Sequence, residues 1–582
     1  MARLVLKAEW LVTEMKIDKN KIFIWLSGIL TGTTVFLLIY GLFTLDVTHD
    51  SWIMLGYENN DIIQHYAGWL GYRNSAISFP IGHIDGMSEG SYAVYADCIP
   101  LVAVIFKCLF RLTGYSGIFQ YFGWYTLTVY CLQAVTAGFI AGRRTENKAF
   151  IFLTEILFTC SPVMLERSFR HTSLSSHFII LLAIYLYLKC RDNAYSRFPI
   201  MMYVLSALCL WISPYFMPFM LCMDVILFIE GAYKTRKVLK WLMYLGVNIL
   251  LMAAGCVLLG LVGTGVNAEG FGLGLYGINL NSLFNPVSTY DTDWSLVLPK
   301  LPLWGLQGEE TFEYAGLGIL AALLTIIAVW TINKDGRKHL IKNIKAYPVY
   351  IIAMIFVTLI AISVNVTFGD KLLFGVKLFP ALESLLSIFR SSQRFFWLIY
   401  YSMFIYADYM ILNAAEYLKE KGLFKKMKND IPAVIIMALL LVVQLADISD
   451  AAHEKGIAPG RVLTEEQLKQ VDLSSLTEQF TGYDRMVVID EQDVYQGRDL
   501  AVCAMKAGMH ISYTVASRGD ISLTEETKAE EADLLKGITQ KGTVYITFDE
   551  AKAEAVYEAN PGILVEAANL LRYTAYIFFV PA

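Results

Sequence analysis

Acidic, amide and imidazole side chains gather in the segment that follows the first apolar stretch. From Leu45 to Gly82 the chain reads LDVTHDSWIMLGYENNDIIQHYAGWLGYRNSAISFPIG. Residues 61–73 are helix-like, and in a helix Asp61, Gln64 and His65 share one face. Asp61 could then act as a general base with Gln64 or His65 as its orienting neighbour. The same pattern is also typical of an amphipathic helix that rests on a membrane surface.

Basic side chains that could bind an anion lie in two other segments. Arg170 and His171 belong to the short segment 166–173, and Arg390 and Arg394 stand four residues apart. Residues with this spacing project from the same side of a helix. Guanidinium groups bind phosphate through paired hydrogen bonds, so these arginines are candidate phosphate ligands. The alternative is that they only anchor the chain at the membrane interface.

The long segment 264–313 contains the residue types that recognise sugars. It includes GFGLGLYGINLNSLFNPVSTYDTDW and leads into WGLQGEETFEYAGLG. Aromatic rings stack on sugar faces, while amides and carboxylates bind hydroxyl groups. The glycines do not form a phosphate-binding fingerprint, because no strand–turn–helix frame surrounds them.

These segments are positioned by a chain that is mostly apolar. Of its 582 residues, 56% are hydrophobic and 17% are charged, and the mean hydropathy is +0.50. This composition excludes an ordinary soluble protein. A membrane-crossing helix needs about 20 apolar residues. Eleven such helices are predicted, at 22–45, 117–141, 149–165, 174–188, 198–213, 214–229, 241–263, 314–332, 347–364, 395–413 and 431–447.

A further apolar run at 98–113 decides the topology. It contains Lys107 and Arg111, which lie four residues apart on one helical face. We predict that this run lies along the interface, where its two basic side chains could guide a lipid headgroup. With eleven spans, the inner segments carry 25 Lys and Arg and the outer segments carry 9. Lysine and arginine favour the cytoplasmic side, so this arrangement is preferred.

The chain divides into three parts on this topology. Residues 1–21 are a basic cytoplasmic leader, 22–447 form the membrane domain with a large first outer loop at 46–116, and 448–582 lie outside the cytoplasmic membrane. In the last part, strand-like runs at 486–489, 543–547 and 575–580 alternate with helix-like runs at 464–480, 496–508, 524–537 and 549–558. This alternation predicts a small α/β domain.

The cysteines do not indicate a cofactor. Nine are scattered along the chain without a CxxC pair, so neither a metal site nor a disulfide framework is predicted. No cofactor is expected, and nothing points to a nucleic-acid partner.

Several runs together resemble a known family. These are NDIIQHYAGWLGYRNSAISFPIG (60–82), YADCIPLVAVIFK (95–107), YGINLNSLFNP (276–286), GLQGEETFEYAGLG (305–318) and FRSSQRFFWLIYY (389–401). They resemble a family of bacterial polytopic proteins in the GT-C-like glycosyltransferase superfamily. The resemblance covers most of 22–413 and implies about eleven spans with interfacial helices in a large first outer loop.

The resemblance also implies an essential acidic residue in that loop. The matching position is Asp61, but Ile62 follows it where many GT-C enzymes have a second acid. This departure favours a metal-independent reaction, although a divalent metal stays an alternative. Asp97, later in the same loop, is the candidate second carboxylate.

These inferences combine into a functional prediction. A sugar would pass, with inversion, from a polyprenyl-phosphate donor to a cell-envelope polysaccharide, lipid or protein on the outer face of the membrane. Asp61 and Asp97 are the candidate catalytic residues. The candidate substrate ligands are Gln64, His65, Arg73, Lys107, Arg170, His171, Arg390 and Arg394. A transporter or flippase of lipid-linked saccharide, and a non-catalytic envelope-assembly protein, are the alternatives.

Overall fold

The structure is a computed structural model of the chain. It describes residues 18–55, 61–88, 91–263, 272–288, 292–332, 334–422, 427, 430–460, 464–491, 496–515, 524–570 and 573–582, without the side chains of 335, 339, 457–460, 467 and 470. The predicted basic leader 1–21 lies outside the described residues, except for its last four positions.

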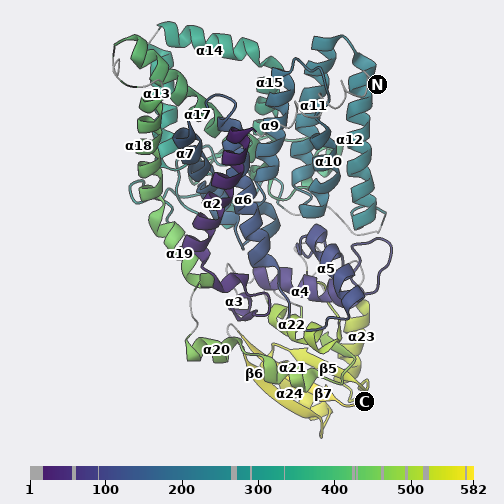
Figure 1. Cartoon of the computed structure of the whole chain (residues 1–582). Helices are drawn as coiled ribbons and strands as arrows, with labels where there is room; N and C mark the ends of the chain where they lie inside the picture. Colours follow the sequence, from purple (N-terminus) through teal and green to yellow (C-terminus); the bar gives the residue numbers. More distant parts are fainter. Residues whose placement is uncertain are drawn as a thin grey trace, which may run out of the picture.

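The chain up to residue 460 is a helical bundle with most of its long helices side by side (Figure 1). Its helices are α2 (Lys19–Tyr40), α3 (Ser51–Met54), α4 (Asp61–Asn74), α5 (Pro100–Thr113), α6 (Phe122–Ala141), α7 (Lys148–Thr159), α8 (Pro162–Arg167), α9 (Phe178–Asp192), α10 (Ile200–Ile212), α11 (Phe216–Thr235), α12 (Val238–Leu259), α13 (Leu317–Ile332), α14 (Lys334–Ala346), α15 (Pro348–Ile362), α16 (Pro380–Ser387), α17 (Trp397–Glu420), α18 (Ile431–Asp447) and α19 (Ser449–Gly460). A two-stranded hairpin, β1 (Asn365–Phe368) and β2 (Lys371–Gly375), interrupts them.

Among the described residues, six helices are long and apolar enough to cross a membrane. They are α2, α6, α11, α12 and two longer stretches, Thr172–Asp192 and Ser392–Glu420. Two bent pairs, α13 with α14 and α18 with α19, would bring the number to eight. Each of the eleven predicted segments contains a helix, but a count of eleven spans is not confirmed. Helices α7, α10 and α15 have 12, 13 and 15 residues, fewer than the about 20 that a crossing needs.

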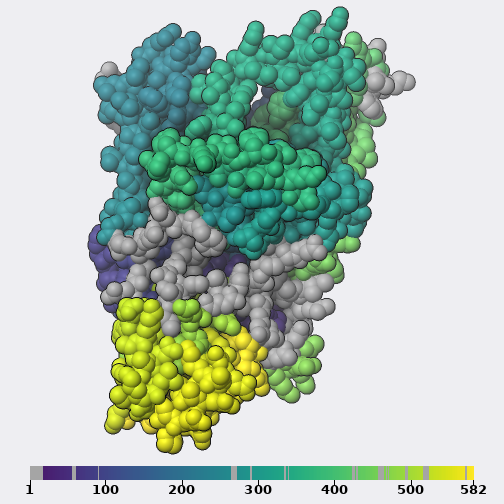
Figure 2. Space-filling model, turned by 180° about the vertical axis from the view of Figure 1, so that it is seen from behind, coloured from purple at the N-terminus to yellow at the C-terminus, as the bar shows by residue number. Residues whose placement is uncertain are grey.

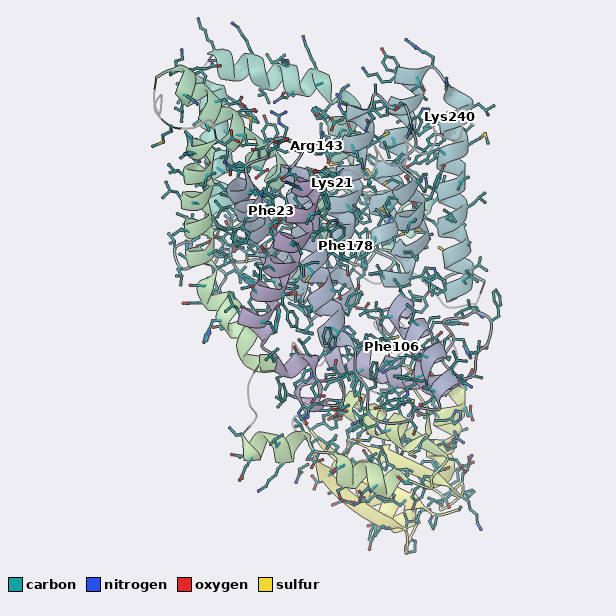
Figure 3. The ribbon with its side chains drawn as sticks, in the orientation of Figure 1. Lys21, Phe23, Phe106, Arg143, Phe178 and Lys240 are labelled. Atoms are coloured by element: carbon teal, nitrogen blue, oxygen red, sulfur yellow. The ribbon has the colours of Figure 1, made fainter. Side chains whose placement is uncertain are left out.

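Several basic residues of the predicted inner segments lie at one end of the bundle. Lys21, Arg143 and Lys240 lie near one end, together with the basic helix α14, whereas Phe106 lies near the other end (Figure 3). The predicted inner segments that contain these basic residues therefore lie at the opposite end of the bundle from α5 (Figures 1 and 3). Which end faces the cytoplasm stays a prediction.

Helix α2 packs closely on α6 because two glycines lie four residues apart on α2. A Cβ added at Gly28 would lie 2.6 Å from Val135 Cγ2, and one added at Gly32 would lie 2.5 Å from the Cα of Cys131. Small residues at this spacing let the backbones of membrane helices approach each other. The α2–α6 contact thus depends on the absence of side chains at both positions.

The first outer loop forms a layer below the long helices, where α3, α4 and α5 lie (Figure 1). In α4 every side chain from Ile62 to Tyr72 is buried. The alternative of a solvated helix resting on the membrane surface is therefore wrong for α4. Helix α5 is different: Ile105, Leu109 and Leu112 are exposed on it, and its 14 residues keep it out of the candidate spans.

The C-terminal part contains a five-stranded sheet with the order β4–β3–β5–β7–β6. Its strands are β3 (Arg485–Val488), β4 (His510–Ile511), β5 (Thr543–Thr547), β6 (Leu564–Asn569) and β7 (Thr574–Val580), and its helices are α20 (Glu465–Val471), α21 (Ser474–Phe480), α22 (Arg498–Ala507), α23 (Glu525–Leu534) and α24 (Glu550–Ala559). Strand β3 runs parallel to β4 and β5, and β7 runs antiparallel to β5 and β6. The three predicted strands and the small sheet domain are confirmed, while β4 and β6 were not predicted.

This domain is docked onto the first outer loop through α22. Asn74 Nδ2 donates a 2.7 Å hydrogen bond to the Met505 carbonyl, and Lys506 Nζ lies 2.5 Å from Asp50 Oδ2. The buried side chains of α22 belong to the same apolar core as those of α4. The C-terminal domain therefore shares a core with the membrane domain.

The close α2–α6 contact predicts that Gly32→Val destabilises the protein. Overpacking of this kind costs about 1–3 kcal/mol, because one helix must move away from the other. We expect a lower melting temperature in detergent. Gly246→Val on α12 is the control, since a Cβ at Gly246 meets no atom within 4 Å. Equal melting temperatures for the two variants would contradict the packing described.

Candidate functional site

Three arginines converge on the buried carboxylate of Glu310. Arg394 Nη2 lies 2.8 Å and Arg167 Nη1 lies 3.3 Å from Oε2, while Arg390 Nη2 lies 3.0 Å from Oε1. Arg167 also donates a 2.6 Å hydrogen bond to the Glu310 carbonyl. We call Glu310, Arg167, Arg390, Arg394 and His171, which lies 3.9 Å from Oε1, the Glu310 cluster.

Most members of the cluster stand at the end of a short helical element. Arg167 is the last residue of α8, Glu310 follows the 3₁₀ turn Gly305–Glu309, and Arg394 lies in the 3₁₀ turn Ser392–Phe396 that leads into α17. Short turns at the ends of long helices can bring distant parts of a chain together. Arg390 and Arg394 were predicted to project from the same side of one helix end. In the structure Arg390 precedes the 3₁₀ turn and lies outside a helix, but both side chains bind the Glu310 carboxylate.

The cluster carries an excess of positive charge. Burial opposes ionisation of Glu310, but Arg394 and the other basic groups hold the pKa of its carboxyl well below the usual range. Burial also lowers the pKa of Arg167 to about 10 and that of His171 well below 6.5. His171 is therefore neutral at neutral pH. Within the cluster, as far as the described residues go, three guanidinium groups face one carboxylate, which is an excess of two positive charges.

His171 connects the cluster to Asp61. Its Nε2 atom lies 3.9 Å from Asp61 Oδ2 and 3.9 Å from Glu310 Oε1. The Asp61 side chain is 20% exposed, whereas that of Glu310 is 7% exposed. Burial raises the pKa of Asp61, and Arg498 acts in the opposite direction. The structure thus brings Asp61 and the carboxylate that binds the arginines close to the same imidazole nitrogen.

The C-terminal domain contributes a side chain to this site. Arg498, the first residue of α22, donates to Asp61 Oδ1 at 3.1 Å and to Gln64 Oε1 at 2.7 Å. No sequence pattern indicated that this domain takes part in chemistry, because a single arginine in a polar helix resembles any surface residue. Its part in the site depends on the docking of α22 onto α4.

His65 and Asp97 form a separate pair beside the cluster. His65 Nε2 lies 3.3 Å from Asp97 Oδ2, and the Ser173 hydroxyl donates to Asp97 Oδ1. Asp97 has a φ of 55°, a conformation that costs energy for a residue other than glycine. His65 was predicted to orient Asp61, but its ion pair is with Asp97. Gln64 instead shares Arg498 with Asp61.

A second buried ion group adjoins the cluster. Glu166 Oε1 lies 2.6 Å from Arg170 Nη1, and Glu166 Oε2 lies 3.2 Å from Lys455 Nζ. Arg170 also donates to the carbonyl of Glu309, at 3.0 Å. This group holds the chain on both sides of Arg167 and Glu310, so Arg170 has a positioning role.

Three predicted basic ligands do not reach the cluster. Arg73 donates to the carbonyls of Gly117 and Tyr115, at 2.7 and 3.0 Å. Lys107 donates to the Ala76 carbonyl at 3.0 Å, and Arg111 donates to the Ser75 carbonyl at 2.6 Å. In this structure these three side chains bind backbone carbonyls, and their predicted role in binding substrate or guiding a headgroup stays a prediction. Backbone carbonyls just beyond the ends of α4 and α5 accept hydrogen bonds from all three side chains.

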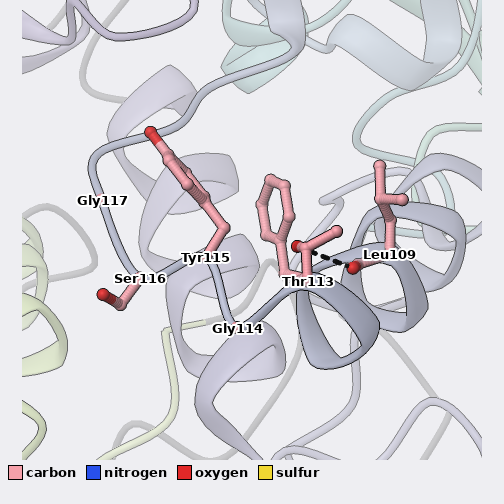
Figure 4. Close-up of a pocket in the computed structure, with 7 residues that line it drawn as sticks. Leu109, Thr113, Gly114, Tyr115, Ser116 and Gly117 are labelled. Carbon is pink, nitrogen blue, oxygen red and sulfur yellow. Dashed lines mark hydrogen bonds between the residues drawn. The ribbon is translucent and has the colours of Figure 1, made fainter.

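A hollow lies at the end of α5 (Figure 4). Leu109, Phe110 and residues 113–117 line it, and no acidic or basic side chain is among them. It is therefore distinct from the Glu310 cluster. Among the residues that the structure describes, no three His, Cys, Asp or Glu side chains are grouped to hold a metal ion.

The chain matches two related family models. The first, described as "Domain of unknown function (DUF6311)", matches residues 29–449, and the second, "DUF6311 C-terminal domain", matches residues 475–569. The first match covers well over half of the sequence, so the chain belongs to the DUF6311 family. No protein with a curated description matches it.

The cluster geometry predicts a large effect of Glu310→Gln. Removing one partner of a buried ion pair costs about 3–5 kcal/mol, because the remaining charges stay buried without compensation. We expect a lower melting temperature and a partial recovery when inorganic phosphate is added. Glu309→Gln is the matched control, because Glu309 is the preceding residue and is exposed. If phosphate raises the melting temperatures of both variants equally, the cluster is not an anion site.

Proposed function

We propose that this member of the DUF6311 family is a membrane glycosyltransferase that uses a polyprenyl-phosphate-linked sugar as donor and a cell-envelope hydroxyl as acceptor. The observation that carries the proposal is the excess of positive charge around Glu310, next to the carboxylate of Asp61. Guanidinium groups bind phosphate well, and a nearby carboxylate can accept the proton of an acceptor.

The donor phosphate would bind at the arginines of the cluster. The Nε–H groups of Arg167 and Arg394 are buried and donate no hydrogen bond among the described residues. Buried donors of this kind usually have a partner, which an added phosphate oxygen could be. Arg390 is the most exposed of the three, at 29%, so it lies on the side from which a ligand can enter.

Asp61 would act as the general base. Its Oδ1 atom accepts from Arg498 at 3.1 Å, whereas Oδ2 lies 3.9 Å from His171 Nε2, beyond hydrogen-bond distance. Oδ2 is therefore the oxygen that can take a proton. Burial raises the pKa of Asp61, which makes its carboxylate a stronger base than an exposed aspartate.

The proposed reaction is a single displacement. Asp61 takes the proton from the acceptor hydroxyl while the hydroxyl oxygen forms a bond to the anomeric carbon. The bond from that carbon to the phosphate oxygen breaks, and the phosphate leaves with the bonding electrons, so the configuration inverts. The arginines stabilise the charge on the leaving phosphate. Stabilisation of this kind is worth about 3–4 kcal/mol for one hydrogen-bond donor.

The acidic residues within the helices favour an enzyme over a flippase. Glu155 accepts from Ser27 at 2.8 Å, Asp224 accepts from Tyr244 at 2.6 Å, and Asp408 accepts from Thr154 at 2.7 Å. Each acid thus has its own hydroxyl partner. Transporters instead tend to place ionisable residues along a substrate path or a proton relay.

The test compares two variants of the site. Asp61→Asn should lower sugar transfer by about 10²–10⁴-fold, because the general base is lost, and should keep the donor lipid. Arg394→Gln should lose the lipid phosphate that copurifies with the protein, as measured by mass spectrometry. Arg144→Gln, an exposed arginine outside the cluster, is the control and should keep both.

The other outcomes identify the rival functions. Lipid movement across vesicles that survives Asp61→Asn, with no sugar transfer in the parent protein, would indicate a flippase. If neither variant changes the copurified lipid or the assembly of the envelope, the protein would be a non-catalytic assembly protein.

A further inference from the structure

The β1–β2 hairpin presents apolar side chains on both of its faces. Every residue of β2 is exposed, and Leu372, Leu373 and Phe374 are 45%, 51% and 57% exposed. Successive residues of a strand point to opposite faces. Neither face of β2 is therefore covered by the described residues.

The apolar surface continues beyond the hairpin. Val376 and Phe379 are exposed, and so is Leu385 in α16, a helix in which no residue is buried. Figure 2 shows this green part of the chain on the surface of the rear face, above the yellow C-terminal domain. We call residues 365–387 the apolar hairpin segment. A surface of this kind on a protein marks an interaction site.

The neighbouring helix α15 indicates what covers the segment. Its residues Ile352, Phe356 and Leu359 are 61–67% exposed and lie on one stripe. With 15 residues it is about 22 Å long, against about 30 Å for the hydrocarbon core. The hairpin starts three residues after α15 ends, so its exposed apolar side chains follow the α15 stripe directly along the chain.

The backbone sets how deep the segment can lie. A two-stranded hairpin has open edges, and unpaired N–H and C=O groups are not tolerated facing lipid inside the hydrocarbon core. The exposed Lys371 and Lys377 also require a polar environment. Both constraints are met at the boundary between acyl chains and headgroups, where apolar side chains can enter the lipid while the backbone remains near water.

The segment is attached to the chain next to Glu310 and to the chain that leads to Arg390. Gln307, three residues before Glu310, donates to Thr367 Oγ1 at 2.9 Å, and Asn279 donates to the Gly369 carbonyl at 2.8 Å. At its other end the segment runs from α16 directly to Arg390. A displacement of the hairpin would therefore be transmitted to the anion-binding groups.

We propose that the apolar hairpin segment enters the lipid boundary of one leaflet and holds the Glu310 cluster at headgroup depth. The occupant of this surface is bilayer lipid, and the anion that the cluster receives is the phosphate of a lipid that enters from the side. The second statement rests on the proposed function, whereas the lipid contact does not. Continuity with the α15 stripe and the flanking lysines favour lipid over a protein partner.

The test places a photoreactive p-benzoyl-phenylalanine at position 374 in the full chain, in vesicles of phosphatidylcholine and phosphatidylglycerol. The matched control is the same residue at Tyr557 of the C-terminal domain, because Phe374 and Tyr557 are 57% and 56% exposed. Illumination should give phospholipid adducts at 374, detected by mass spectrometry, and at least tenfold fewer at 557.

The remaining outcomes contradict the inference or separate it from the proposed function. Covalent dimers at position 374 would identify a second copy of the chain as the occupant, and equal lipid adducts at both positions would overturn the inference. If lipid adducts form at 374 but Arg394→Gln leaves the copurified lipid unchanged, the proposed function fails while the lipid contact stands. If Arg394→Gln loses that lipid but no adducts form at 374, the lipid contact fails while the proposed function stands.

Discussion

The ion pairing of Glu310 is the interaction on which the arrangement of the site depends. Three guanidinium groups from two parts of the chain cannot share a largely buried space without a negative partner, since unpaired buried charges cost several kcal/mol each. Glu310 provides that partner and binds all three within 3.3 Å. The positive charge that remains in the cluster is the basis of the proposed anion binding, so the same ion pairing accounts for the cohesion of the site and supports that proposal.

The need to pair buried charges also explains why two domains and a hairpin meet around the cluster. Arg498 of the C-terminal domain neutralises Asp61, and Gln307 links the hairpin to the chain next to Glu310. Buried charges that face one another need fixed positions, because a charge that loses its partner stays buried without compensation. The docked domain and the hairpin each fix one part of the site through these contacts.

The sequence predicted the positions of the helices better than it predicted the contacts of the site side chains. Each of the eleven predicted apolar segments contains a helix. The apolar stretches could not distinguish full crossings from short helices such as α7, because apolar residues continue past the end of the short helix. Asp61, His171, Arg390 and Arg394 were placed correctly near one another by residue type and by membrane side. The carbonyl partners of Lys107 and Arg111 were not predicted, because spacing shows which side chains share a helical face but not which backbone groups lie opposite them. Arg498 and Glu310 depend on long-range contacts that local patterns do not encode.

Binding of a lipid phosphate at the Glu310 cluster can be observed directly in an experimental density map of the protein in lipid nanodiscs. We expect a phosphate density within hydrogen-bond distance of the Nε atoms of Arg167 and Arg394, with its acyl density running toward the apolar hairpin segment. A well-resolved map in which Glu310 alone occupies the three guanidinium groups, with ordered lipid bound elsewhere, would show that the cluster is not a lipid-phosphate site.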